Sequence, residues 1–145
     1  MKHHNDMNMK LRHYVILFLF LLLGACTATR HAGKVELAGT PPGDDSTSYE
    51  LIVMDPGFET WFLTRSKPAW FHSQQYYENW NRQYVLEWNM KATSPRHSRI
   101  FETIIGYDPT VDYGLEINHK LFYYFIYVEN ELGIPVLPRG LSPSY

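Results

Sequence analysis

The chain has 145 residues, 13 of them basic and 15 acidic, and its formal net charge is −2. This length accommodates a single domain, and the mild acidity argues against nucleic-acid binding and against a polybasic patch for membrane lipids. Cys26 is the only cysteine, so an internal disulfide is excluded.

The N-terminal residues have the three parts of a secretory signal peptide. Three basic residues precede an apolar run at residues 15–23, and two small residues follow it. A transmembrane helix is the alternative, but it needs about 20 apolar residues to cross about 30 Å of hydrocarbon. Because the apolar run is shorter, we predict a signal peptide over residues 1–25 that is cleaved between Ala25 and Cys26.

The residues around this cleavage position, Leu23-Gly24-Ala25-Cys26, resemble a lipobox. The resemblance implies that Cys26 carries diacylglycerol on its sulfur and an acyl chain on its amine. One acyl chain holds a protein only marginally at a membrane, whereas two or more hold it stably. We therefore expect Cys26 to be the lipid attachment site and the membrane to be its first partner. An ordinary signal peptide followed by a stray cysteine is the alternative.

The residues after Cys26 favour one location in the bacterial cell envelope. Thr27 stands where many inner-membrane lipoproteins have an aspartate, which favours the outer membrane. Residues 27–31 lack the acidic cluster that resembles a surface-export signal in Bacteroidota, which favours the periplasmic face.

Residues 26–48 are predicted to be a lipidated, flexible tether. They are rich in small and polar residues and contain no aromatic side chain, so they bury little surface against the entropy of ordering. A flexible chain of this length reaches about 25 Å. Ser46 lies in Asp45-Ser46-Thr47, which resembles an O-glycosylation site of Bacteroidota. An ordinary polar linker is the alternative interpretation of that tripeptide.

The composition changes at Tyr49, and residues 49–137 are predicted to form an aromatic-rich globular domain. Nineteen aromatic residues lie between Tyr49 and Val128. Residues 138–145 are predicted to be an extended tail.

The predicted elements begin with a short strand at residues 49–54, followed by a turn at residues 55–57. A helix is predicted at residues 74–91, with Ser73 as its N-cap. Helical spacing places four aromatic residues on one face of this helix, namely Tyr77, Trp80, Tyr84 and Trp88.

A second short strand is predicted at residues 100–105, and a turn at residues 108–110. The last helix is predicted at residues 113–132, between Asp112 as N-cap and Gly133 as the residue that ends it. Its core face contains Ile117, Leu121, Tyr124, Phe125, Val128 and Leu132. Together these elements predict a small single α+β domain dominated by two amphipathic helices.

No nucleophile motif and no glycine-rich phosphate loop occurs in the sequence. Glu116 and His119 have the spacing of a metal-binding pair, but a solvated helix face, with Glu116 paired to Lys120, explains them better. Asp108 and Asp112 have the spacing of a calcium loop that lacks its glycine and its last glutamate, so we interpret them as a turn residue and a helix cap. We expect no cofactor, no metal site and no catalytic residue.

Two interpretations of the aromatic residues stay open. Large aromatic side chains stabilise a small core, but Tyr and Trp are also enriched at binding surfaces. Trp61 and Trp70 are candidates for such a surface. Tyr123 and Tyr127 are further candidates, because helical spacing places them opposite the core face of the last helix.

Three motifs carry a resemblance to a known family: Asp55-Pro56-Gly57-Phe58-Glu59 with Trp61, Tyr84-x-x-Glu87-Trp88-Asn89, and Tyr107-Asp108-Pro109 leading into Asp112-Tyr113-Gly114. With them the chain resembles a domain-of-unknown-function family of short lipoproteins from Bacteroidota. The resemblance implies an envelope location and implies no activity.

Three functions therefore stay open. We favour a non-catalytic accessory or interaction module that binds an envelope protein. A glycan-binding module that uses exposed aromatic residues is the second. The third is a small hydrolase that uses two carboxylates, for which the candidates are Asp55, Glu59, Glu78 and Glu87.

Overall fold

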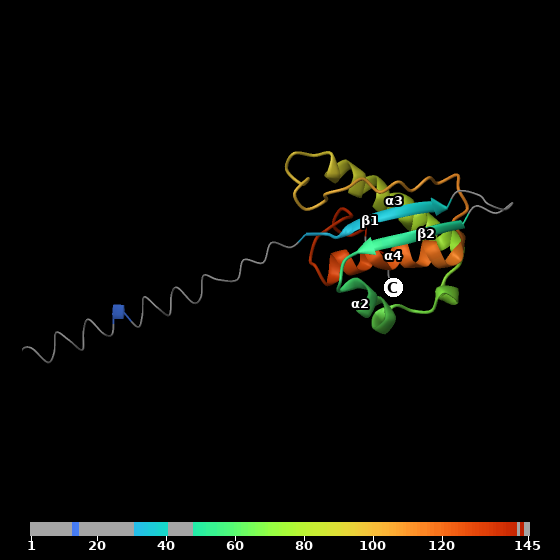
Figure 1. Cartoon of the computed structure of the whole chain (residues 1–145), viewed down its shortest axis with the longest axis horizontal. Coiled ribbons are helices and arrows are strands. Elements are labelled where there is room, and N and C mark those ends of the chain that lie inside the picture. The colour runs from blue at the N-terminus through green and yellow to red at the C-terminus, as the bar shows by residue number, and fades with distance from the viewer. Residues whose placement is uncertain (1–12, 15–30, 41–47, 142, 144–145) are drawn as a thin grey trace, which may run out of the picture.

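The structure is a computed structural model that describes residues 13–14, 31–40, 48–141 and 143. Its elements follow one another in the order β1 (Lys34–Thr40), β2 (Ser48–Met54), α2 (Phe58–Arg65), the short 3-10 helix η1 (Ala69–Phe71), α3 (Gln74–Ala92) and α4 (Gly114–Asn130). The two strands and the helices form one small α+β domain (Figure 1), which confirms the predicted fold class.

Strands β1 and β2 form an antiparallel hairpin in which Lys34 pairs with Met54 and Thr40 with Ser48. The prediction of a flexible tether is therefore wrong at residues 34–40, and the folded part begins before Tyr49. A strand is stabilised by its partner and by one buried face, and here Val35 is buried on β1. Composition counted along the chain does not reveal that pairing. Residues 31–33 and 48 are also described, and residues 26–30 and 41–47, including Cys26 and Ser46, lie outside the described residues.

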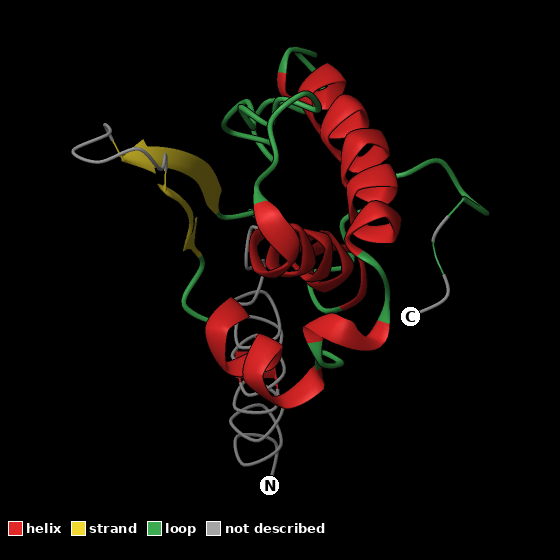
Figure 2. Ribbon diagram, turned by 90° about the vertical axis from the view of Figure 1, so that its right-hand side faces the viewer, coloured by secondary structure: helices red, strands yellow, loops and turns green. Residues whose placement is uncertain are grey.

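Helix α4 is the centre of the domain. It contacts α3, α2, η1 and β2, and Figure 2 shows these elements on different sides of it. All eight residues from Leu121 to Val128 are buried. The prediction that Tyr123 and Tyr127 lie opposite the core is therefore wrong, because α2 covers the face of α4 that the sequence pattern left open.

Helix α3 follows the prediction closely. The hydroxyl of Ser73 accepts a hydrogen bond from the N–H of Tyr76 at 3.2 Å, and the helix ends at Ala92, one residue later than predicted. Its buried face contains Tyr77, Asn81, Tyr84, Val85 and Trp88. The face is thus the predicted aromatic stripe, with Trp80 at its half-buried margin.

Helix α4 is shorter than predicted at both ends. It begins at Gly114, whose φ of 77° is readily adopted only by glycine. A carboxylate oxygen of Asp112 accepts the N–H of Gly114 at 2.9 Å, although Tyr113 is the N-cap residue. The helix ends at Asn130, and Gly133 with a φ of 64° turns the chain away from it.

Residues 100–105 do not form the predicted strand. The side chain of Asn89 accepts the N–H of Ile105 at 2.8 Å and donates to the carbonyl of Ile105 at 3.0 Å. The indole N–H of Trp88 donates to the carbonyl of Thr103 at 2.7 Å. These side chains of α3 take the place of a neighbouring strand and hold the segment as a loop.

The chain after α4 folds back onto the domain. One carboxylate oxygen of Glu129 accepts the N–H groups of Val136 and Leu137 at 3.0 and 2.8 Å. Beyond them, the N–H of Leu141 donates to the carbonyl of Pro138 at 3.2 Å. Residues 138–141 therefore form a turn and not the predicted extended tail.

An exposed aromatic pair as a candidate functional site

The four aromatic residues that the sequence suggested for binding separate into two groups. Trp61 is half-buried, and its ring centroid lies 5.4 Å from that of Tyr127 and 6.4 Å from that of Tyr123. Its indole N–H donates to Glu131 at 2.8 Å. Three of the four residues thus form one internal cluster, and Trp70 is not part of it.

The hydroxyls of the two buried tyrosines hold neighbouring segments in place. Tyr123 accepts the N–H of Lys67 at 3.1 Å, and Tyr127 donates to Asp55 at 3.0 Å. Burial, together with the adjacent Asp55, raises the pKa of Tyr127 to about 12. These tyrosines are structural, and no ligand can reach their ring faces without opening the domain.

Trp70 and Phe71 form the exposed aromatic pair, which lies on η1. The side chain of Trp70 is 77% exposed and that of Phe71 is 45% exposed. Lys67 places its ammonium 4.1 Å from the ring centroid of Phe71. Adjacent exposed aromatic rings with a cation beside them can stack on a sugar ring or on a partner's apolar side chain.

A rigid base supports the exposed pair. The ring of His72 stacks on Tyr76 with centroids 3.9 Å apart and an interplanar angle of 18°. Burial and the charge of Lys67 lower the pKa of His72, so the imidazole is neutral at pH 7. Its Nε2 is buried without a hydrogen-bond partner among the described residues. Phe71 packs edge-on against the same ring, at 4.7 Å.

His119 also supports this segment, and the sequence placed it wrongly. We expected a solvated pair of Glu116 and His119, but His119 is only 4% exposed. Its Nε2 donates to the carbonyl of Lys67 at 2.7 Å, and burial lowers its pKa. Lys120 pairs with Glu59 at 2.6 Å rather than with Glu116. Helix α2, which was not predicted, places Glu59 beside Lys120 and Phe62 against the ring of His119, and Lys67 lies two residues after this helix.

The two aspartates with calcium-loop spacing accept hydrogen bonds within the fold, Asp108 in a turn and Asp112 just before the N-cap residue of α4. Asp108 accepts both the N–H and the hydroxyl of Thr110, at 2.8 and 2.7 Å, and these bonds lower the pKa of its carboxyl. Asp112 accepts the N–H of Gly114 and the amide of Gln74. Within the described ranges, no group of three or more His, Cys, Asp or Glu side chains could hold a metal ion.

The candidate carboxylates for hydrolysis lie on different elements. Asp55 follows β2 and binds the hydroxyl of Tyr127, and Glu59 on α2 pairs with Lys120. Glu78 on α3 accepts the amide of Gln74 and lies 3.9 Å from Arg82. Glu87 lies one helix turn before Lys91 on α3. Three of these four carboxylates therefore have partners within the fold.

Phe71, Lys67 and His72 are site residues that the sequence did not single out. The adjacent Trp70 and Phe71 were visible as a pair of aromatic residues, but nothing in a local pattern states which side chains will be exposed. The cation near the ring depends on the turn between α2 and η1. That turn is fixed by contacts of Lys67 with α4, which are distant in sequence.

The fold and the candidate site define a small α+β domain with an aromatic core and one exposed aromatic pair. Residues 14–142 match the model of a family of unknown function, DUF6146, and the chain belongs to that family. No curated protein and no solved structure matches the chain. In the part of the chain that the structure describes, no helix is long and apolar enough to cross a membrane.

The three motifs that carried the family resemblance have structural roles in this domain. Asp55 accepts the N–H of Gly57 at 2.9 Å, and the turn places Phe58 in the core. The second motif supplies Trp88 and Asn89, which hold residues 103–105. In the third, the rings of Tyr107 and Tyr113 stack with centroids 5.0 Å apart. The function of the family is unknown, so membership of it assigns no activity to the chain.

Proposed function

We propose that the protein is a lipid-anchored lipoprotein of the bacterial cell envelope whose domain is a non-catalytic accessory or interaction module. One observation carries the proposal: Leu23-Gly24-Ala25-Cys26 directly follows an apolar run at residues 15–23 and contains the only cysteine. A diacylated or triacylated Cys26 would hold the domain at a membrane without a transmembrane segment. The outer membrane and its periplasmic face are part of the proposal.

The described contacts of the domain lie after the proposed cleavage site, which supports removal of the signal peptide. Among the residues that the structure describes in the domain, the first contacts join His31 and Ala32 to residues 99 and 100. Cleavage before Cys26 therefore removes nothing from the hairpin or from the helices. A signal sequence that extended into β1 would have been incompatible with removal.

The use of polar groups in the interior supports a binding role rather than a catalytic one. Asn118 accepts the hydroxyl of Tyr107 and the amide of Asn81, at 2.9 and 3.2 Å, and donates to the carbonyl of Gly114. Glu129 accepts the hydroxyl of Tyr84 and the two tail N–H groups. These groups hold elements together inside the fold, whereas the exposed aromatic pair makes no such contact with a described residue through Trp70 and is open to a partner.

Metabolic labelling with a fatty acid tests the anchor. We expect the full chain to incorporate label and to be shortened by the signal peptide, and the Cys26→Ser variant to remain unlabelled and uncleaved. Thr27→Ser is the matched control, because it changes the adjacent residue and leaves the cysteine. Labelling of Cys26→Ser at the wild-type level would contradict the proposal.

A crosslinking pull-down from the protein's own membranes tests the interaction module. We expect an envelope protein to co-purify with the lipoprotein and to be lost when both Trp70 and Phe71 are replaced by alanine. Leu63→Ala is the control, because Leu63 is 80% exposed but lies on α2 outside the pair. If the same amount of partner is recovered with both variants, the partner does not bind through Trp70 and Phe71.

A glycan-binding module is the second candidate, and the exposure of Trp70 favours it. A flat, exposed indole stacks on the apolar face of a pyranose ring, and Lys67 can supply a hydrogen bond to a hydroxyl. Co-sedimentation with insoluble envelope polysaccharide would then be lost in Trp70→Ala and kept in Leu63→Ala. If the wild-type protein does not co-sediment with the polysaccharide, this candidate is excluded.

A further inference from the structure

The chain between the proposed anchor and the domain is short. Only residues 27–30 separate Cys26 from His31, which is already bound to the fold through the carbonyl of Arg99 at 2.8 Å. A fully extended chain spans at most about 3.6 Å per residue, so Cys26 lies within about 18 Å of His31. An acylated Cys26 therefore brings this end of the domain to the membrane surface; the inference rests on the proposed function.

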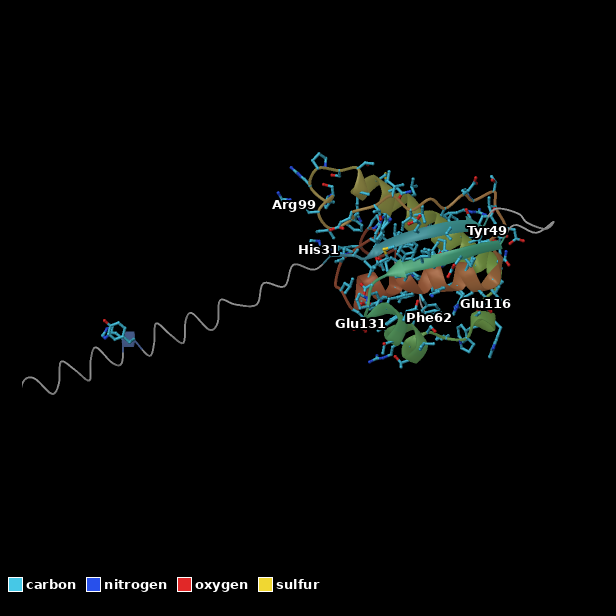
Figure 3. All side chains as sticks on the ribbon, viewed as in Figure 1. His31, Tyr49, Phe62, Arg99, Glu116 and Glu131 are labelled. Atoms are coloured by element: carbon cyan, nitrogen blue, oxygen red, sulfur yellow. The ribbon has the colours of Figure 1, made fainter. Side chains whose placement is uncertain are left out.

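Three segments of the chain meet at this end, and together they contain basic residues and no acidic ones. They are residues 31–35, 91–101 and 133–141. The first contacts the second through His31 and Ala32. The second contacts the third because Lys91 donates to the carbonyls of Pro135 and Val136. Figure 3 shows His31 and Arg99 side by side, with Glu116 at the opposite end of the domain.

Three arginines of these segments are available at the surface. Arg96, Arg99 and Arg139 are exposed, and none of them has an ion pair with a residue that the structure describes. Arg139 lies near the loop that holds the other two, because it lines the same groove of about 350 Å³ as His97.

Several other charged groups at this end have partners within the fold. Lys91 is half-buried and bound to the carbonyls of Pro135 and Val136. Lys34 pairs with Glu36 at 3.1 Å, and Glu102 is an acidic group close to His31, at 3.6 Å. Asp55, after β2, and Glu131, after α4, are acidic groups toward this end that bind neutral partners, namely the hydroxyl of Tyr127 and the indole of Trp61. The end therefore contains charges of both signs, and the three arginines are exposed cations on it that have no ion pair with a described residue.

This local charge is hidden in the composition of the chain. Without residues 1–25, the chain has 10 basic and 14 acidic residues, a formal charge of −4. Six of the 10 basic residues lie in residues 27–35, 91–101 and 132–145, which contain none of the 14 acidic residues. A membrane surface rich in anionic lipids attracts basic segments within about one Debye length and repels the remaining acidic surface.

We propose that Arg96, Arg99 and Arg139 form a basic surface that binds the anionic phosphates of lipid headgroups in the membrane that carries the Cys26 anchor. Guanidinium groups bind phosphate oxygens with paired hydrogen bonds, which suits a surface of headgroups. The short link to Cys26 keeps the three arginines close to those phosphates. The domain is thereby held in one orientation, with the end that contains Glu116 directed away from the lipid.

A probe on the arginine loop tests this orientation in the acylated protein. Acylation consumes the thiol of Cys26, so in Ser98→Cys the new cysteine is the only free thiol and accepts one fluorescent label. The labelled protein is placed in vesicles of phosphatidylethanolamine and phosphatidylglycerol that contain a headgroup nitroxide quencher. Gln75→Cys is the control, because Gln75 is exposed at the start of α3, next to the residue that bonds Asp112.

We expect strong quenching at residue 98 and weak quenching at residue 75. Replacing Arg96 and Arg99 by glutamine should lower the ratio of docked to undocked protein roughly 30-fold, because each basic residue near an anionic surface contributes about a factor of five. Replacing both by lysine should largely preserve docking. The matched control replaces Arg65 and Arg82 by glutamine, which removes the same charge elsewhere and should leave quenching unchanged.

Several outcomes overturn the inference. Equal quenching of both probes, or equal quenching of residue 98 in vesicles of phosphatidylcholine alone, would show that the short link positions the loop without headgroup binding. If quenching falls equally when Arg96 and Arg99 or Arg65 and Arg82 are replaced by glutamine, the net charge of the protein accounts for the effect. If Cys26 remains a free thiol, two labels are incorporated; the proposed anchor then fails and the inference fails with it. If the protein is acylated but the probe at residue 98 is not quenched, the proposed anchor stands and only the inference about the arginines is overturned.

Discussion

Helix α4 and the segment at residues 58–72 contain the same number of aromatic residues, five each, and use them differently. All five on α4 are buried, namely Phe122, Tyr123, Tyr124, Phe125 and Tyr127. In residues 58–72 only Phe58 is buried, and Trp70 and Phe71 are exposed. The difference lies in the neighbours, because α4 is covered on several sides, whereas α2 and η1 pack on the domain with one side only.

The comparison shows that aromatic content by itself does not distinguish a core from a binding surface. The hydrogen bonds of the polar atoms on these rings distinguish the two more clearly. Tyr124 and Tyr127 on α4 donate to the carbonyl of Gly33 and to Asp55, at 2.7 and 3.0 Å, so their hydroxyls are satisfied inside the fold. The indole of Trp70 lies at the surface instead, so a partner can contact its ring.

The largest effect is expected for a residue that packs against α4. Trp88 is fully buried, contacts Tyr124 and Phe125, and donates to Thr103. Trp88→Ala should lower the free energy of unfolding by about 3–5 kcal/mol, because it leaves a cavity and an unpaired carbonyl. Urea denaturation followed by far-ultraviolet circular dichroism measures this change.

Leu86→Ala on the same helix is the control for Trp88→Ala. Leu86 is 61% exposed, so its replacement should change the free energy of unfolding by less than about 0.5 kcal/mol. Similar losses in the two variants would contradict the assignment of α4 and its neighbours as the core.

A smaller loss is expected at the end of α4. Glu129→Ala removes the acceptor of two backbone N–H groups and of the Tyr84 hydroxyl. The free energy of unfolding should fall by about 2 kcal/mol, since hydrogen bonds to a charged acceptor contribute about 1.5–3 kcal/mol. Hydrogen exchange at Val136 and Leu137 should accelerate in the same variant. Glu50→Ala, at an exposed position, is the control and should leave the exchange rates at the wild-type level. Wild-type exchange rates at Val136 and Leu137 in Glu129→Ala would refute this role.

A pH dependence is expected from His119, where α4 meets the exposed segment. Burial lowers its folded-state pKa below the ordinary value of 6.5, so the unfolded chain binds a proton more readily. Stability is therefore full above pH 6.5 and is lost progressively as the pH falls below it. His72 contributes in the same direction.

Denaturation at a series of pH values in wild-type protein and in His119→Gln checks this dependence. Glutamine can keep a donor near the carbonyl of Lys67 and does not titrate, so the slope should decrease and only the part due to His72 should remain. His97→Gln, at an exposed position, should keep the wild-type slope. A slope of wild-type size in His119→Gln would rule out His119 as its source.

The smallest effect is expected at the surface. Trp70→Ala should change the free energy of unfolding by less than about 0.5 kcal/mol, because the indole is 77% exposed. A loss of binding to a partner or glycan in this variant would then be a local effect. A loss of stability above about 2 kcal/mol would show instead that Trp70 is part of the core.

Elements with their own local signals could be predicted from the sequence. Helix α3 has an N-cap serine and an aromatic stripe, and β2 has a short run of β-prone residues. The turn at Asp108 and the glycine after α4 follow from side-chain chemistry and from positive φ. In each case the residues that specify the structure lie within a few positions of it.

Features that depend on distant partners could not be predicted. Strand β1 has only Val35 and Leu37 as large apolar residues and forms against β2. Residues 100–105 look like a strand but bind side chains of α3. Helix α2 was missed, and with it the burial of Tyr123 and Tyr127. The exposed aromatic pair is defined by what does not cover it, which no local pattern records.

The tyrosine hydroxyls of α4 have a consequence for the order of folding. They reach Gly33, Asp55 and Lys67, which are 91, 72 and 56 residues away from their partners in the chain. Contacts between such distant positions form late, because the loop between them must close first. The hairpin and the exposed segment therefore cannot reach their final positions until α4 has been synthesised.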